Sequence, residues 1–222
     1  RDYLDASSLA SVPRQGGPKW VWFESFDTAD AAPIAASAAA NPGPGTTHFT
    51  GSTGSIAGGL YVEDSASVAV GPYQNTARPR TGLAMVAYGV NFSRATTFDF
   101  SFTSTAGFGV SSQRPGLQAS GGALTQVDGG TAFTAHAASP ITTSSLWDIC
   151  VLADATGGFG FYRASGAATW TLVACTRFDT TATIFPRFRW FNAAGTMKAM
   201  GSATGVPMPR PWYCLSPITM PI

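Results

Sequence analysis

Hydrophobic and polar positions alternate with a period of two residues along several stretches of the chain. The clearest is 97–102, where three phenylalanines alternate with polar residues. Residues 20–26 and 83–92 form aromatic and aliphatic runs of similar or greater length. Such runs, rich in aromatic and β-branched side chains, are typical of β-strands. We predict strands in all three stretches and place Asp99, between Phe98 and Phe100, on a solvated strand face.

The region 147–190 has the most regular pattern. Apolar runs lie at 147–153, 159–163, 170–175 and 184–190. Short turns separate them, and the turn at 154–158 carries two glycines, so they predict an antiparallel meander. Pro186 cannot donate to a strand ladder, which makes the last run an edge or interrupted strand. Shorter strands are expected at 60–62, 67–70, 108–110 and 197–200.

The remaining segments lack this alternation. Residues 29–40 are rich in alanine and predict a short helix, whereas 111–145 predict long loops with weak strands. Residues 1–18 read as an N-terminal arm or linker. Residues 205–222 carry five prolines, so they form neither a helix nor a central strand. They are either disordered or laid extended over a neighbour, and Trp212 and Tyr213 favour the second alternative. The predicted organisation is therefore a β-sandwich domain at 19–204 between two arms.

Composition limits the possible partners. Only 11% of the 222 residues are charged, and the net charge is +1. Nucleic acid and anionic membranes normally require clustered basic residues, so neither is expected as a partner. Membrane insertion is not expected either, because no run of 18 apolar residues is present. Low charge also weakens repulsion between copies, which favours a surface or particle protein.

The sequence lacks the residue patterns that catalysis would require. Glycoside hydrolysis requires two carboxylates about 5–10 Å apart, yet Glu24 and Glu63 are isolated in the chain. Glu63 and Asp64 are interpreted as a turn pair. His48 and His136 lie far apart, in segments predicted as loops, and no metal-binding spacing is present. We expect no enzyme activity, no metal and no cofactor.

Three cysteines, Cys150, Cys175 and Cys214, leave two possibilities open. Cys150 and Cys175 form a disulfide if their strands are neighbours. The alternative is that the cysteines are small buried apolar residues.

Tryptophan and arginine provide the candidate binding residues. Most of the six tryptophans are expected to fill the sandwich core, and Trp190 and Trp212 are the two expected to be exposed. Arg187 and Arg189 alternate with Phe188 and Trp190, so one strand face carries guanidinium groups. That face is either solvated or a protein contact. The predicted ligand-binding residues are Trp190, Arg187, Arg189 and Trp212.

The order of these elements carries a family resemblance. A long aromatic first strand precedes a glycine-rich insertion, and then come Trp-Asp-Ile-Cys-Val-Leu, Gly-Gly-Phe-Gly-Phe-Tyr-Arg, Trp-Thr-Leu-Val and Ile-Phe-Pro-Arg-Phe. This resembles the concanavalin-like (LamG or legume-lectin type) jelly rolls of phage particle and bacterial surface proteins, over 20–200 and best over 147–191. The resemblance implies an all-β, antiparallel two-sheet β-sandwich that binds glycans or builds an extracellular or virion surface. The calcium-site residues of lectin relatives have no recognisable counterpart.

These observations favour a non-enzymatic structural or attachment component of a virus particle, most naturally of a phage. Its arms would hold other copies of itself or other particle proteins, and its surface would contact host glycans. The alternative is a secreted, lectin-like carbohydrate-binding module. The expected location is the virion or the extracellular space.

Overall fold

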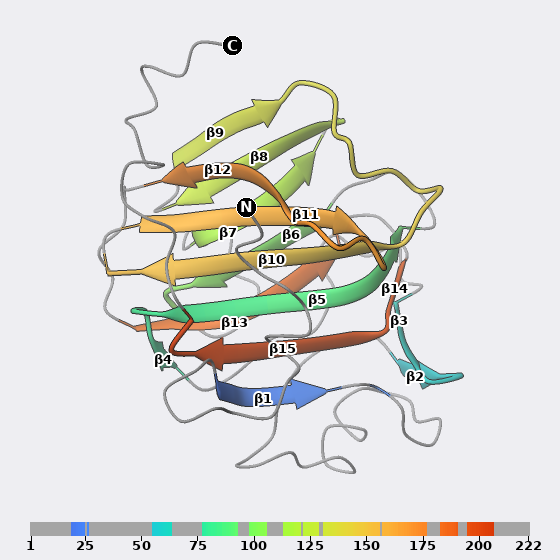
Figure 1. The fold of residues 1–222 in the computed structure, drawn as a ribbon, viewed down its shortest axis with the longest axis horizontal. Coiled ribbons are helices and arrows are strands. Elements are labelled where there is room, and N and C mark those ends of the chain that lie inside the picture. The colour runs from blue at the N-terminus through green and yellow to red at the C-terminus, as the bar shows by residue number, and fades with distance from the viewer. Residues whose placement is uncertain are drawn as a thin grey trace.

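The protein folds as two antiparallel β-sheets packed face to face, which confirms the predicted all-β sandwich (Figure 1). The computed structural model describes residues 19–24, 26, 55–63, 77–92, 98–105, 113–120, 122–128, 131–155, 157–176, 183–190 and 195–206. Every described element is a strand. Among these residues no helix has the length and hydropathy that crossing a bilayer requires.

Nine strands form the larger sheet and six form the smaller one. The larger sheet contains β1 (Lys19–Glu24), β2 (Ser55–Ala57), β3 (Leu60–Glu63), β5 (Leu83–Phe92), β10 (Trp147–Asp154), β11 (Gly157–Ala164), β12 (Thr171–Thr176), β14 (Gly195–Met197) and β15 (Ala199–Thr204). The smaller sheet contains β4 (Arg78–Pro79), β6 (Phe98–Thr103), β7 (Gln113–Ser120), β8 (Ala123–Asp128), β9 (Thr131–His136) and β13 (Thr183–Trp190).

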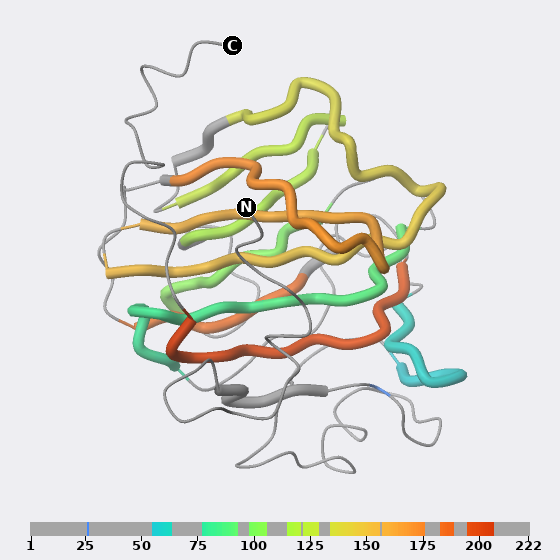
Figure 2. Tube along the Cα trace, viewed as in Figure 1, coloured from blue at the N-terminus to red at the C-terminus, as the bar shows by residue number. Residues whose placement is uncertain are grey.

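The larger sheet forks along one side of β5. β10 pairs with the other side, and β11 and β12 follow it. On the forked side, β14 pairs with one end of β5 and β15 with the rest. Each branch continues outward, through β3 and β2 in one case and through β1 in the other. The chain passes from β14 to β15 through Lys198, which therefore lies at the fork. Figure 2 traces the course of the chain through the two sheets.

The sandwich core lies between the two sheets and is rich in aromatic residues. Phe98, Phe100 and Phe102 alternate along β6, and all three are buried against the larger sheet. Phe188 from the adjacent β13 packs on Phe100 with ring centroids 5.1 Å apart. Burial of one such side chain contributes about 1.5–3 kcal/mol, so this aromatic layer is a main source of sheet-to-sheet cohesion.

The opposite face of β6 corrects one prediction. Asp99 is buried rather than solvated, and Ser101 beside it is buried as well. Arg187 of β13 donates from Nη2 to Asp99 Oδ2 at 2.6 Å and to Ser101 Oγ at 3.0 Å. Burial lowers the pKa of Arg187, and the carboxylate of Asp99 acts against that shift. Period-two alternation identifies the apolar face of a strand, but it does not show whether the other face is covered.

Most predicted strands are present, and their edges lie within a few residues of the prediction. β10, β11 and β12 form the predicted antiparallel meander. The meander does not include β13, which crosses to the smaller sheet and pairs with β6. β4 pairs only with Thr183 and Ile184, so from Phe185 to Trp190 the one described strand that pairs with β13 is β6, as expected for an edge strand.

The region predicted as long loops is mostly strand. β7, β8 and β9 form an antiparallel run in the smaller sheet. The predicted helix at 29–40, the strands at 67–70 and 108–110, the N-terminal arm and residues 207–222 of the C-terminal arm lie outside the described residues. Of the C-terminal arm, Gly205 and Val206 are described, and Val206 is buried. The domain boundaries remain predictions.

The structure decides between the two alternatives for Cys150 and Cys175. Cys150 is a free, fully buried thiol, whereas Cys175 is disulfide-bonded. A bridge between these two residues is therefore excluded, and Cys150 is the buried apolar residue expected from the second alternative. Cys214 lies outside the described residues.

Candidate functional site

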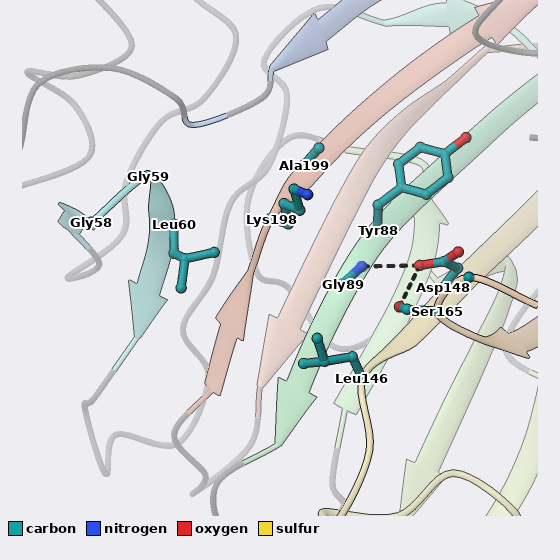
Figure 3. Close-up of a pocket in the computed structure, with 11 residues that line it drawn as sticks. Gly58, Gly59, Leu60, Tyr88, Gly89, Leu146, Asp148, Ser165, Lys198 and Ala199 are labelled. Carbon is teal, nitrogen blue, oxygen red and sulfur yellow. Dashed lines mark hydrogen bonds between the residues drawn. The ribbon is translucent and has the colours of Figure 1, made fainter.

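A groove of about 700 Å³ lies on the outer face of the larger sheet, where the sheet forks (Figure 3). That volume is within the usual range for small-molecule sites. Five separate segments line it: Gly58, Gly59 and Leu60; Tyr88 and Gly89; Leu146 and Asp148; Ser165 and Gly166; and Lys198 and Ala199. The groove thus depends on the tertiary fold and not on any one motif.

A β-bulge in β5 shapes the floor of this groove. Trp147 pairs with Val90 and Ile149 with Ala87, so Tyr88 and Gly89 together oppose the single residue Asp148. Gly89 has φ +58°, which only glycine adopts readily. A Cβ at this position would lie 2.9 Å from the Cβ of Lys198. Gly89 therefore allows the backbone of β5 to approach Lys198 at the fork.

Asp148 holds the bulge to the neighbouring strand and turn. Its Oδ1 accepts hydrogen bonds from the Gly89 amide at 3.0 Å and from Ser165 Oγ at 2.7 Å (Figure 3). Its Oδ2 accepts a hydrogen bond from Arg163 Nε at 2.9 Å. The guanidinium of Arg163 lies 4.5 Å from the centroid of the Trp170 ring, a cation–π arrangement. One carboxylate thereby fixes three of the segments that border the groove.

The groove combines apolar and polar surface. Leu146 is 48% exposed and is the large apolar side chain most open to solvent among the described residues. Tyr88 is half-buried, and desolvation raises the pKa of its phenol. Ser165 and Lys198 add polar groups at the border, where Gly58 and Gly166 are exposed. This arrangement suits a flat ligand with both C–H faces and hydroxyl groups.

None of the residues predicted to bind a ligand is among the described residues that line this groove. Arg187 lies in the other sheet and is fully buried, so the exposed guanidinium face predicted for β13 is wrong at this position. Arg189 and Trp190 pair through their backbones with Asp99 and Phe98. Their side chains and the whole of Trp212 lie outside the described residues, so their predicted role stays a prediction.

Other candidate residues also take structural positions. Glu63 is buried at the end of β3 and accepts a hydrogen bond from Tyr61 Oη at 2.9 Å, so it does not lie in a turn. His136 ends β9 rather than lying in a loop, and its ring meets that of Tyr162 edge-on. Sequence analysis missed the groove residues. The one local signal was Gly89, because a glycine inside a strand often marks a bulge.

Comparison with known proteins gives a fold and no sequence family. No protein-family model and no curated protein matches the sequence. The fold is similar to that of the exoplasmic/lumenal domain of VIP36 bound to Ca²⁺ and Man3GlcNAc, with a TM-score of 0.54, 7% identity, and coverage of 74% of this chain and 86% of that chain. The metal-free form of the same domain gives a TM-score of 0.51, 5% identity, and coverage of 76% and 88%. The carbohydrate-binding module CBM66 from Bacillus subtilis is also similar, with a TM-score of 0.47, 9% identity, and coverage of 71% and 96%.

The chain therefore has a concanavalin-like, lectin-type β-sandwich fold, and the VIP36 domain carries this conclusion. A calcium ion bound by proteins has six to eight oxygen ligands. The described residues do not fit such a site, because they contain no group of three or more His, Cys, Asp or Glu side chains that could hold a metal ion. The buried carboxylates of Asp99, Asp128 and Asp148 instead lie beside arginines.

Proposed function

We propose that this chain is a non-enzymatic glycan-binding module and that the groove at the fork is its binding site. The carrying observation is the groove itself, a volume of about 700 Å³ on the outer face of a lectin-type sheet. Oligosaccharides present apolar C–H faces and rings of hydroxyl groups. Tyr88 and Leu146 supply apolar contact for the former, whereas Ser165 supplies hydrogen bonding for the latter.

The acid chemistry near the groove supports binding rather than hydrolysis. Asp148 is the carboxylate among the residues that line the groove, and three protein donors occupy its oxygens. A glycosidase needs two carboxylates placed on either side of the scissile bond. Asp148 acts instead as a structural centre that keeps the groove in shape.

The test combines a glycan screen with a pair of matched variants. Gly166 lines the groove with φ +85°, and a Cβ added there meets nothing within 4 Å. Gly122 has φ +83° and equally open surroundings, but it lies in the turn between β7 and β8 of the other sheet. Asparagine tolerates positive φ better than most residues, so G166N and G122N carry similar backbone strain.

The expected result is that a glycan found with the wild-type chain binds G122N normally and G166N at least tenfold more weakly, by calorimetry. Silence of the wild-type chain across neutral and acidic glycans would overturn the function. Equal affinity of the two variants for the glycan would show that the binding site lies outside this groove.

A role in a virus particle rests on the terminal arms, of which the structure describes residues 205 and 206. Light scattering over a concentration series, with and without residues 205–222, tests it. A trimer or larger assembly that dissociates when those residues are removed supports a particle component. A monomer with and without those residues supports the secreted module instead. Either form of the proposal places the protein outside the cell or on a virion.

A further inference from the structure

The charged groups that line the groove are unequal in what they offer a ligand. Two such side chains are present, Asp148 and Lys198. Asp148 is 3% exposed and binds Arg163 through an ion pair of 2.9 Å. Lys198 is exposed, and it forms no ion pair within the part of the chain that the structure describes. The electrostatic character of the groove therefore depends on how much of the Asp148 charge remains available.

Asp148 has little capacity left for a ligand. Its two oxygens already accept from the Gly89 amide, Ser165 Oγ and Arg163 Nε. A carboxylate offers about four acceptor sites, and three are occupied here. Because Asp148 is 3% exposed, a sugar hydroxyl would have to displace the groups around it to reach the remaining site, which would loosen the bulge or the turn. The positive charge of Arg163, itself 7% exposed, also offsets the negative charge of the carboxylate. What the groove presents to an incoming ligand is the single positive charge of Lys198.

The backbone fixes the place of that charge. The amide of Lys198 donates to the carbonyl of Tyr88 at 3.0 Å, across the fork between β15 and β5. The Cβ of Lys198 lies over Gly89, as the 2.9 Å approach to a Cβ built there shows. The ammonium group thus extends from a position anchored to the backbone of Tyr88, while Leu146 comes from the segment before β10, which pairs with the other side of β5 (Figure 3).

We propose, building on the glycan-binding function above, that the preferred ligand is an acidic saccharide. Its carboxylate or sulfate group pairs with the Lys198 ammonium while a neighbouring sugar ring packs on Tyr88 and Leu146. A charge-assisted hydrogen bond of this kind is stronger than one to a neutral hydroxyl. Lys198 is the one cationic side chain among the described residues that line the groove, so one acidic group per bound segment suffices.

The test uses pairs of oligosaccharides that differ only in charge. Oligouronates are compared with their methyl esters, and sulfated oligosaccharides with their desulfated counterparts, at low and at moderate salt. The variant is K198Q. The matched control is K19Q, because Lys19 is the other lysine of the chain and pairs with Thr204, at the opposite end of β15.

The acidic member of a pair is expected to bind about three- to tenfold more tightly than its neutral partner, and added salt should reduce the difference. K198Q should abolish that difference, and K19Q should retain it. The relative affinities of uronates and sulfated sugars identify which acidic group is preferred. Binding of neutral and acidic partners with equal affinity overturns the charge preference and leaves glycan binding intact. Absence of binding to every saccharide overturns the proposed function as well.

Discussion

Replacing Asp148 by alanine should lower the free energy of unfolding, and the contacts of Asp148 give the size of the loss. The substitution removes the acceptor of three hydrogen bonds and leaves Arg163 as a buried cation without its carboxylate. Removal of one partner of a buried ion pair costs about 3–5 kcal/mol. For a chain of this size that corresponds to a fall in Tm of roughly 6–20 °C.

Thermal and urea unfolding of matched variants measure this cost. D154A is the control, because Asp154 lies at the other end of β10 and is partly exposed, and within the described part of the chain its carboxylate accepts one local hydrogen bond, from the Ala155 amide. It should cost about 1 kcal/mol or less. The double variant D148A/R163M should lose less stability than the sum of its two single variants, by 1 kcal/mol or more. If D148A costs no more than D154A, or if the two single effects add within about 0.5 kcal/mol, Asp148 does not organise the groove.

Three further predictions concern buried groups in the two sheets. Burial raises the pKa of the Cys150 thiol, so it should resist thiol reagents in the native protein and react once urea unfolds the chain; comparable native and unfolded rates would contradict its burial. Burial also raises the pKa of Tyr88. As pH rises, the Cys150 thiol and the Tyr88 phenol stay protonated in the folded state but ionise in the unfolded chain. The free energy of unfolding should therefore fall as pH rises above about 8.5. A C150A/Y88F variant should show a shallower alkaline decline in urea titrations, and a wild-type value that is constant to about pH 10.5 refutes the linkage. R187M should lose about 3–5 kcal/mol of unfolding free energy because it leaves the buried Asp99 carboxylate without its cation, whereas R187M/D99L should recover much of that loss. A double variant as unstable as R187M would show that the ion pair does not cause the loss.

The strands could be predicted from the sequence because the information that forms them is local. The alternation at Phe98, Phe100 and Phe102 is visible within six residues, and β6 forms there. β10 and β11 pair up to Asp154 and Gly157, next to the two glycines Gly157 and Gly158 in the sequence. Pro186 also lies in a part of β13 where β6 is the one strand partner among the described residues, which suits a residue without an amide donor.

Sheet assignment and burial of the second face could not be predicted in this way. β13 leaves the meander for the other sheet, which depends on pairing between segments more than 80 residues apart in the chain. Asp99 alternates with apolar residues in the pattern of a solvated position, yet it is buried with Arg187. β7 to β9 contain many small residues with weak strand propensity, and they are strands because each has a partner on at least one side.

The candidate site was the least predictable part. Its residues come from five segments, and none of these segments carries a motif that marks a ligand. Tryptophan and arginine directed the prediction toward β13, but the groove lies in the other sheet and takes its polar groups from Asp148, Ser165 and Lys198. Only the fold brings the bulge at Gly89 opposite Asp148 and next to the fork in the sheet.

A crystal structure of the chain with the tightest saccharide from the paired screen tests the central claim most directly. The account predicts a sugar ring in the groove against Tyr88 and Leu146, with its acidic group within hydrogen-bond distance of Lys198 Nζ and with the Asp148 hydrogen bonds unchanged. A saccharide bound elsewhere on the molecule, with the groove empty, would contradict it.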